Sequence, residues 1–577
     1  MSISKPDPIA RRSMMRKYIP PAILVLILLW TCPLFGENYT LKGDMDSAIR
    51  YELQEQVTAN PGVKKIILSF VVPQSFTSPT YSQDIKDFKV IFNPEPQDRE
   101  EKKDKHGNIV ITATWSRVPN TVDVRLSCQA KSRTHLTTLS TGAPFPVKDP
   151  GAEFADYLKS TEQVQANEPR IKKLATDLTS GVKTEYDAVQ RIVSWVVDNV
   201  RYVTPPVRYD AVYSLESGKG NCQNYSHLSA ALLRSVGIPA RIVVGVTLNE
   251  PYNIAWQKGI LTFKMGQGRH SWIEVWFPDL GWVPFDPQNS VLFVSNRFIR
   301  LEVGADNNET KNDGLMRWSQ LQEAKRPALQ EVINASFASD QVKIKGDRES
   351  YGPKNLLLTP QVKAQFQQIA IIPPPPPPPP PKDPGKLRYT VPFLYGNLDY
   401  PEDVDFAFPR SVKAAGAGQF EMQNNFLVET AEYVTTQRTQ YAQVFVLKKP
   451  VKLAKVGLAL HNFGGDGILW IDLFKDDNGK PGALVATSGM IGVEQISMKP
   501  GYRWVDFDFA KEKLDLMPGS YWIALGFTGS PIVNWFYTYG KPVGPVYGTR
   551  YKGVFDSDWS GALSYEFNYR IAGLTVK

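Results

Sequence analysis

Three side chains with the chemistry of a nucleophile, a base and an acid follow one another along this 577-residue chain. They are the thiol of Cys222, the imidazole of His270 and the carboxylate of Asp286. An imidazole that takes the proton of a neighbouring thiol makes it a strong nucleophile, and a carboxylate on the second ring nitrogen fixes the tautomer of that imidazole. The residues are 48 and then 16 positions apart, which a helix and a hairpin can bring together. The pattern predicts nucleophilic catalysis by a cysteine.

Cys222 is expected in the first turn of a helix. Residues 222–235 have helical character, and Gly220 and Asn221 directly precede them. The unpaired backbone N–H groups and the positive end of the dipole at a helix N-terminus favour the thiolate. The sequence therefore predicts a thiol that is activated by its position. Another helix, predicted over residues 184–199, precedes it.

His270 and Asp286 are expected on neighbouring strands. Residues 270–276 alternate as a strand does, and residues 278–281 are typical of a turn. Asp286 then lies on the returning strand, where its carboxylate can accept the second imidazole N–H. We expect the sulfur, the ring and the acid to meet at one cleft.

The other histidines and the nearby tryptophans have simpler interpretations. His227 lies on the same predicted helix as Cys222 but roughly 140° away around its axis, which favours a packing role. His106 lies in a turn and His135 in a polar stretch, so both are expected at the surface. The tryptophans near the site are expected in the core, with a cleft for an acyl acceptor as the alternative; they are Trp272, Trp276 and Trp282.

Together these motifs resemble the transglutaminase-like superfamily. The similarity covers residues 186–288, and the segments that carry it are 220–228, 232–234, 237–241, 270–275 and 282–287. The resemblance implies a papain-like fold in which Cys222 is the nucleophile, His270 the general base and acid, and Asp286 the orienting residue. Gln288 stands where many relatives have Thr. No cofactor or metal is expected, because the calcium sites of animal transglutaminases have no evident counterpart.

The first 36 residues are expected to form a signal peptide or a membrane anchor. The uncharged apolar stretch 19–35 is long enough for the core of a signal peptide. The basic residues between Arg11 and Lys17 mark its cytoplasmic end. The rest of the chain is therefore expected outside the cytoplasm, in the periplasm or cell envelope of a bacterium.

Composition excludes several classes of protein. The formal net charge is +8, of which the leader contributes +4, as five basic residues against one acidic residue. The diffuse remainder gives no basis for nucleic-acid binding. Cys32, Cys128 and Cys222 are too few for a disulfide framework. Cys128 ends an alternating run and is expected to point inward from a strand.

The whole chain is expected to be a multidomain α+β protein, with the papain-like transglutaminase core flanked by an N-terminal and a C-terminal β-sandwich. The expected units are the leader 1–36, the N-terminal β-sandwich 37–150, the core 151–303, a polar linker with polyproline 304–385, and the C-terminal β-sandwich 386–577.

The linker and the C-terminal unit carry further expectations. Helices are predicted over residues 315–335 and 359–369, and the nine prolines 373–381 form a stiff spacer about 28 Å long as polyproline II. Residues 476–479 are expected to form a hairpin turn, with a calcium loop as the alternative.

These features favour an exported, envelope-associated cysteine enzyme that acts on amide bonds through a thioester. Transfer of the acyl group to water makes it a peptidase or amidase, which is slightly favoured, and transfer to an amine makes it a cross-linking enzyme. The expected partners are a protein or peptide substrate associated with the cell wall, the membrane through the N-terminal segment, and glycans at the C-terminal unit. The alternative is a non-catalytic envelope scaffold or a glycan- or protein-binding protein.

Overall fold

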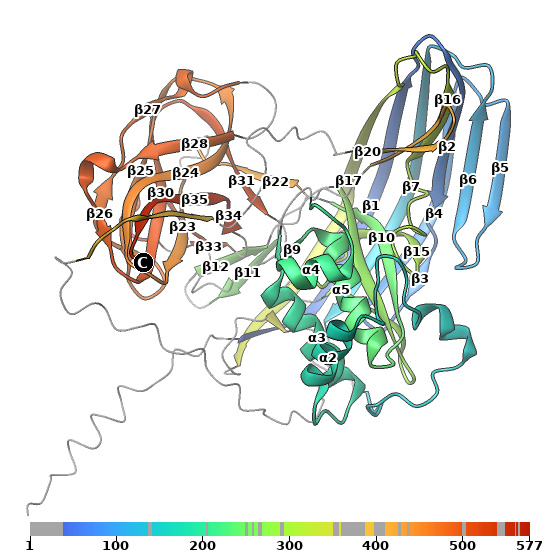
Figure 1. Ribbon diagram of the computed structural model, residues 1–577, viewed down its shortest axis with the longest axis horizontal. Coiled ribbons are helices and arrows are strands. Elements are labelled where there is room, and N and C mark those ends of the chain that lie inside the picture. The colour runs from blue at the N-terminus through green and yellow to red at the C-terminus, as the bar shows by residue number, and fades with distance from the viewer. Residues whose placement is uncertain are drawn as a thin grey trace, which may run out of the picture.

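The computed structural model gives a strand-rich protein with one compact group of helices (Figure 1). The described residues are 38–136, 141–202, 206–248, 252–256, 259–263, 268–288, 293–349, 357–358, 387–396, 410–424, 429–435, 439–498, 503–538, 549–559, 561–563 and 566–577. The leader, the predicted helix 359–369 and the polyproline run lie outside them. Within those ranges no helix is both long and apolar enough to cross a membrane.

Two sheets of long strands enclose the N-terminal core. The first, in the order β17-β1-β7-β4-β3 with β18 beside β1, contains β1 (Asn38–Thr58), β3 (Phe76–Thr77), β4 (Tyr81–Asn93), β7 (Thr121–Leu136), β17 (Ala328–Glu349) and β18 (Leu357–Leu358). The second, in the order β20-β21-β16-β2-β6-β5, contains β2 (Val63–Val72), β5 (Asp98–Lys103), β6 (Ile109–Trp115), β16 (Leu315–Gln320), β20 (Arg410–Gly416) and β21 (Gln419–Asn424).

The alternating apolar residues of these strands form one core. Leu53 of β1 and Leu126 of β7 pack in the same cluster as Leu68 of β2 and Trp115 of β6. Cys128 belongs to this cluster and is 4% exposed, which confirms the prediction that it points inward. Burial raises the pKa of its thiol to about 12, so Cys128 is a packed side chain and a poor nucleophile.

The prediction of a helix over residues 315–335 is wrong. Residues 315–320 form β16, and β17 begins at Ala328 and pairs with β1 in antiparallel register. Along β17 the buried positions are Leu329, Glu331 and Ile333, which is the period of a strand. A carboxylate in the middle of the buried face hides that alternation in the sequence.

The central unit places helices against a small sheet. The sheet has the order β14-β13-β10-β15 and contains β10 (Ala240–Thr247), β13 (Gly268–Phe277), β14 (Gly281–Phe285) and β15 (Phe298–Gly304). The helices are η1 (Ala152–Tyr157), α2 (Pro169–Thr179), α3 (Glu185–Asn199), α4 (Ala211–Ser217) and α5 (Cys222–Ser235), and β8 (Arg201–Tyr202) pairs with β9 (Lys219–Gly220). The helices predicted over 184–199 and 222–235 are both confirmed.

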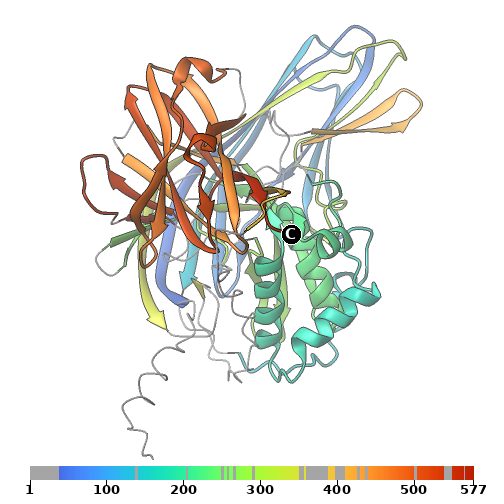
Figure 2. The same ribbon diagram turned by 60° about the vertical axis from the view of Figure 1, so that its left-hand side comes forward.

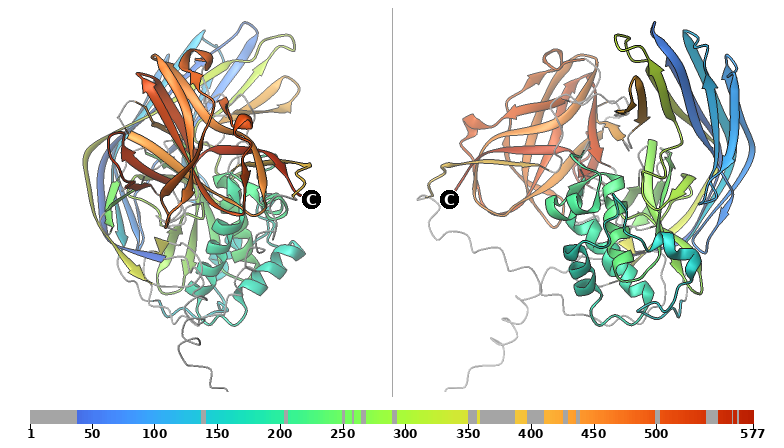
Figure 3. Two further views of the ribbon diagram at one scale, coloured as in Figure 1. Left: turned by 90° about the vertical axis from the view of Figure 1, so that its left-hand side faces the viewer. Right: turned by 45° about the vertical axis from the view of Figure 1, so that its right-hand side comes forward.

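This sheet packs on the helices through some of its side chains and on the N-terminal sheets through others. Ile273 and Val275 of β13 share a core with α3 and α5, whereas Ile299 and Leu301 of β15 join the N-terminal core. The right-hand view of Figure 3 shows the green core strands between the helices and the long N-terminal strands. The sheet that carries His270 is therefore held from both directions.

The C-terminal strands form two further sheets around their own core. One has the order β11-β12-β33-β32-β23-β30-β25-β26 with β27 beside β25, and contains β11 (Tyr252–Trp256), β12 (Gly259–Phe263), β23 (Thr439–Leu447), β25 (Gly467–Asp476), β26 (Pro481–Thr487), β27 (Ile491–Gly492), β30 (Gly519–Gly529), β32 (Thr549–Gly553) and β33 (Gly561–Leu563). The other is built around β24 and contains β19 (Val391–Gly396), β22 (Glu429–Tyr433), β24 (Val451–Gly464), β28 (Arg503–Asp508), β29 (Asp515–Leu516), β31 (Ile532–Thr538), β34 (Glu566–Phe567) and β35 (Tyr569–Thr575). Short helices η3 (Val493–Gln495) and η4 (Ala510–Glu512) connect these strands.

The predicted hairpin turn at residues 476–479 is confirmed. Asp476 ends β25 and pairs with Pro481 at the start of β26. Asn478 and Gly479 have φ of 52° and 80°, the conformation that tight hairpin turns require.

The sheets cross the unit boundaries that the sequence pattern suggests. The hairpin β11–β12 leaves the central unit and pairs through β12 with β33 of a C-terminal sheet. Conversely, β21 returns from beyond the polyproline run and pairs with β16 of an N-terminal sheet. Figure 2 shows these orange strands beside the blue and yellow-green N-terminal strands, away from the other C-terminal strands. Both exchanges tie the C-terminal third to the rest of the molecule.

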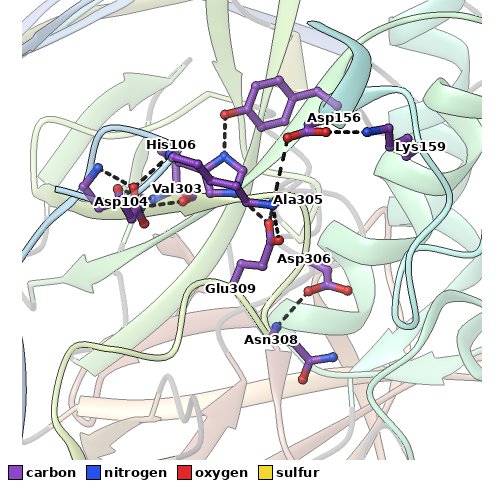
Figure 4. A network of polar contacts seen from close by, with 12 residues as sticks. Asp104, His106, Asp156, Lys159, Val303, Ala305, Asp306, Asn308 and Glu309 are labelled. Carbon is purple, nitrogen blue, oxygen red and sulfur yellow. Dashed lines mark hydrogen bonds and ion pairs between the residues drawn. The ribbon is translucent and has the colours of Figure 1, made fainter. Parts of the chain in front are cut away.

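His106 lies at a junction between units and not at the surface. Its ring contacts the Tyr157 hydroxyl through Nδ1 at 2.9 Å and Glu309 Oε2 through Nε2 at 2.7 Å. Figure 4 shows the contact between His106 and Glu309. Only 3% of the His106 side chain is exposed, so the expectation of a surface residue is wrong. His106 does lie in a turn, but Tyr157 and Glu309, which come from other segments, cover its ring. The side chain of His135, by contrast, is 40% exposed, as predicted.

Candidate active site

Cys222 is the first residue of α5, where the sequence predicted it. Asn221 caps the helix, because its side-chain oxygen accepts the N–H of Gln223 at 3.1 Å. In return, Oδ1 of Asn224 accepts the backbone N–H of Asn221 at 3.1 Å, which completes a reciprocal capping box. The sulfur therefore lies among the first N–H groups of the helix, the position that stabilises a thiolate.

Gly220 is required by the tight approach of the chain to this helix start. A Cβ at Gly220 would lie 2.2 Å from the Cβ of Asn224, a steric clash that would force one of the two residues to move. The Asn224 amide also donates to the carbonyl of Arg208 at 3.0 Å and to the hydroxyl of Ser214 at 2.9 Å. The segment in front of Cys222 is thus fixed on both sides.

His270 and Asp286 meet across the hairpin of β13 and β14. Phe285 ends β14 opposite Ile273, so Asp286 follows one residue beyond the paired strand. The imidazole donates from Nε2 to Oδ2 of Asp286 at 3.0 Å. The other carboxylate oxygen accepts the backbone N–H of Gln288 at 3.1 Å. The carboxylate is therefore fixed at both oxygens and sets the orientation of the ring.

The electrostatics of His270 link it to both partners. Burial alone would lower the pKa of its imidazole, but the charge and hydrogen bond of Asp286 and the contact with Cys222 raise that pKa to about 9. The ring is consequently an imidazolium at neutral pH. A cation beside the sulfur is the arrangement that favours a thiolate.

All three side chains are enclosed. The sequence predicted that they meet at one cleft, but Cys222, His270 and Asp286 are each 0% exposed, so among the described residues these three side chains do not line a surface that is open to solvent. Cys222 packs against Val244 of β10, and the ring of His270 packs edge-on against Phe298 at a centroid distance of 5.3 Å. This closure follows from packing between distant segments, which local sequence patterns do not reveal.

Tyr209 is a neighbour of the sulfur that the sequence did not single out. Burial and the nearby charge of Cys222 raise the pKa of its phenol to about 12, so it remains a neutral hydrogen-bond donor. His227 anchors the backbone of Tyr209, since Nδ1 contacts the Tyr209 carbonyl at 2.6 Å. Tyr209 stands in the connection before α4, and no residue spacing distinguishes it in advance.

His227 has the packing role that the sequence predicted. Its ring is fully buried, and its Nε2 accepts the backbone N–H of Asn307 at 3.3 Å. Burial lowers its pKa to about 4, so the ring is neutral at physiological pH. His227 therefore joins α5 to two loops and does not take part in the Cys222 centre.

Metal ligands do not gather anywhere in the part of the chain that the structure describes. No group of three or more His, Cys, Asp or Glu side chains there has an arrangement that could hold an ion.

Comparison with known families agrees with this geometry. The family model of the transglutaminase-like superfamily matches residues 172–287, a range that begins in α2 and ends one residue after Asp286. Residues 172–287 are a transglutaminase-like core. Cys222, His270 and Asp286 all lie within it.

This chain spans only part of the length of the curated relatives that it matches. The uncharacterized protein YebA of Bacillus subtilis is 34% identical over 126 residues, which are 20% of this chain and 17% of that protein. A protein-glutamine gamma-glutamyltransferase of Pseudomonas aeruginosa is 33% identical over 82 residues, which are 14% of this chain and 11% of that enzyme. A solved structure from Cytophaga hutchinsonii, described as that of a candidate cysteine protease, is 18% identical, with 55% of this chain and 98% of that one covered and a TM-score of 0.38.

The tryptophans of the transglutaminase-like core have packing roles. Trp272 is 1% exposed and contacts the ring of Phe298. Trp276 and Trp282 form a cross-strand pair that is covered by Phe154 of η1, with centroid distances of 4.3 and 5.8 Å. These contacts favour the core interpretation over an acceptor cleft.

Proposed function

We propose that this protein is an exported transglutaminase-like cysteine enzyme that cleaves amide bonds through a thioester on Cys222. The observation that carries the proposal is the bond from His270 Nε2 to Asp286 Oδ2. Cys222 is the first residue of α5, and its interaction with the imidazole contributes to the raised pKa of His270. The imidazole then has one nitrogen fixed by a carboxylate and the other, Nδ1, available for proton exchange with the sulfur.

The first half of the reaction makes the thioester. The Cys222 thiolate attacks the carbonyl carbon of the amide while His270 holds the proton as an imidazolium. Backbone N–H groups at the start of α5 are suited to the negative oxygen of the tetrahedral intermediate. His270 then gives its proton to the leaving nitrogen, the C–N bond breaks, and ammonia or an amine departs.

The second half decides between hydrolysis and cross-linking. His270 takes a proton from water or from an amine, which attacks the thioester carbon. The C–S bond breaks and the thiolate is restored. Water gives peptidase or amidase activity, which we favour, and a lysine amine gives a cross-link. The outcome depends on which acceptor reaches the acyl-enzyme first.

The enclosure of Cys222 makes access part of the proposed mechanism. A substrate carbonyl must come within bonding distance of a sulfur that is 0% exposed. The conformation described here is therefore a closed state, and binding of a substrate requires a rearrangement of the residues that cover the centre.

The proposed location and architecture rest on the leader and the sheets. The apolar segment 19–35 with its basic flank supports export or anchoring, which places the core in the periplasm or cell envelope beside protein or peptide substrates. We interpret each pair of flanking sheets, with its shared core, as a β-sandwich. The division of the chain at residues 150 and 303 is part of the same proposal.

The decisive experiment compares the wild type with Cys222→Ala on bacterial envelope fractions in the presence of a tagged primary amine. We expect cleaved or amine-tagged peptides with the wild type and none with Cys222→Ala. Cys128→Ala is the matched control, because it removes a buried thiol from a different unit. Identical product sets from Cys222→Ala and wild type would refute the catalytic assignment.

The closed centre also supports a second candidate, a non-catalytic envelope scaffold in which these side chains serve only to pack. Iodoacetamide labelling of Cys222 as a function of pH separates the two functions. The enzyme requires that His270→Ala change the pH profile of labelling. A thiol that titrates near 8.5 in both proteins would favour the scaffold.

A further inference from the structure

The residue beside the candidate base is part of a second buried polar cluster. Arg269 directly precedes His270 on β13, and its side chain is 2% exposed. Its guanidinium makes a two-pronged contact with Glu331 of β17, with Nε to Oε1 at 3.1 Å and Nη2 to Oε2 at 2.5 Å. Nη1 contacts Oδ2 of Asp313 at 2.6 Å. The candidate catalytic strand is thereby bound to the N-terminal sheets.

A third carboxyl group, from Glu55, lies at the same point. Glu55 of β1 is directly opposite Glu331 in the register of β1 and β17, and it is 2% exposed. Gly314 shows how closely the groups converge. A Cβ on Gly314 would lie 2.5 Å from Nη2 of Arg269, 2.8 Å from Oε1 of Glu55 and 2.9 Å from Oε2 of Glu331.

The charges of this cluster do not balance unless a proton is bound. Three carboxyl groups face one guanidinium, and two of them are directly opposed on adjacent strands, an arrangement that repels when both are ionised. Burial and the charges of Glu331 and Asp313 raise the pKa of Glu55 well above its usual value. Glu55 is therefore the neutral partner. The titratable or charged groups that face the cluster are Tyr51 and Glu55 of β1, Cys128 of β7, Arg269 of β13, Glu302 of β15, Asp313, and Glu331 of β17.

The cluster also connects to the second N-terminal sheet. Oδ1 of Asp313 accepts the backbone N–H of Val71 in β2 at 3.1 Å. Arg269 is thus tied to β17 through Glu331 and to β2 through Asp313. His270 is the next residue along β13, so a displacement of Arg269 displaces the imidazole relative to Cys222 and Asp286.

We propose that Glu55, Glu331 and Arg269 form a positioning device for His270 that is closed only while one proton is held between the two glutamates. The device rests on the proposed function, because it gives His270 a role in catalysis. When that proton leaves to water at high pH, the opposed carboxylates repel, the start of β13 loosens and turnover falls. Arg269, Glu55 and Glu331 are positioning residues and do not touch the substrate.

The test uses Glu55→Gln, whose amide can donate to Glu331 as the acid does but does not titrate. Glu52→Gln on the same strand is the matched control, since the Glu52 side chain is 32% exposed and faces Arg125. Each full-length protein is followed by its melting temperature and by kcat and KM between pH 6 and pH 10.

The expected stability result follows from the sign of the linkage. The folded protein binds the proton of Glu55 more tightly than the unfolded chain does, so wild-type stability falls as pH rises above the ordinary carboxyl range. We expect Glu55→Gln to gain in melting temperature over wild type as the pH rises, and Glu52→Gln to follow the wild type. If the melting temperatures of wild type and Glu55→Gln change in parallel with pH, the proposal that Glu55 holds a proton is wrong.

The expected kinetic result separates positioning from simple stability. At high pH the wild type is expected to lose turnover more steeply than Glu55→Gln. Two groups, His270 and the glutamate pair, release protons in the wild type, whereas only His270 does so in the variant. KM is expected to be unchanged. Identical kcat profiles would overturn the coupling to His270. Activity that survives in Cys222→Ala would instead refute the proposed function. The melting temperatures do not depend on activity, so they would still test whether Glu55 holds a proton.

Discussion

The imidazole of His270 donates to Asp286 at 3.0 Å while the other oxygen of that carboxylate accepts the Gln288 N–H at 3.1 Å. Asp286 therefore cannot rotate without breaking a bond to the backbone. The ring of His270 is oriented by a group that is itself fixed, which is the requirement for a base that must point at one sulfur.

Replacement of Asp286 by Asn is expected to slow the reaction and to leave the fold intact. The amide has the shape of the carboxylate, but it cannot stabilise the imidazolium and presents a donor to Nε2. We expect kcat to fall by roughly 10²- to 10⁴-fold. Circular dichroism and steady-state kinetics measure the two effects. Asp477→Asn, in the exposed hairpin turn, should keep wild-type turnover, and wild-type turnover in folded Asp286→Asn would contradict the proposed role.

The stability of the protein is expected to fall as pH rises through about 9. The folded-state pKa of His270 lies above the ordinary histidine value, so its ion pair contributes stability that is complete below about 6.5 and is lost at alkaline pH. The contribution is on the order of 3 kcal/mol. Urea unfolding of wild type and His270→Gln at pH 6.5 and pH 10 measures it. A difference between the two proteins that does not change with pH would count against the ion pair.

Acid is expected to weaken the protein through His227. Its folded-state pKa of about 4 is below the ordinary value, so between about pH 6.5 and 4 the unfolded chain binds a proton that the folded protein excludes. Stability is lost as pH falls through this window. His227→Gln should show a smaller loss over the same range in urea unfolding. An equal loss in wild type and His227→Gln would contradict this explanation.

A methyl group at Gly220 is expected to disrupt the start of α5. The added Cβ would lie 2.2 Å from Asn224, and the capping box would have to separate. We expect Gly220→Ala to destabilise the protein by about 1–3 kcal/mol and to reduce turnover in the protein that remains folded. Gly142→Ala is the matched control, because no atom lies within 4 Å of its added Cβ. Equal urea midpoints for the two variants would show that the space around Asn224 can adapt.

The elements of the site that the sequence predicted are those with local signals. Asn221 caps α5 from the adjacent position, and the hairpin between His270 and Asp286 spans only sixteen residues. Such contacts depend on neighbouring residues, so their pattern is visible in the chain. The transglutaminase-like motifs lie in the same short segments.

The features that the sequence did not predict depend on residues far apart. Glu331 can be buried because Arg269, 62 positions earlier, pairs with its charge. In the sequence alone, a charged residue at this position obscures the alternation of the strand in the run 328–337. His106 is covered by Glu309, which lies 203 positions later. The closure over Cys222 belongs to the same class. Each requires the tertiary fold before its environment is defined.

The pairing of β16 with β21 determines when this N-terminal sheet can be completed during synthesis. β2, β5 and β6 emerge early from the ribosome, but the side of their sheet beyond β16 lacks β20 and β21 until residue 424 has been made. Until then the edge of β16 is an open template for other chains. A nascent polypeptide that is secreted before it folds would not expose the unpaired edge of β16 inside the cell. A shortened gene product that stops at the prolines would keep that edge unpaired permanently.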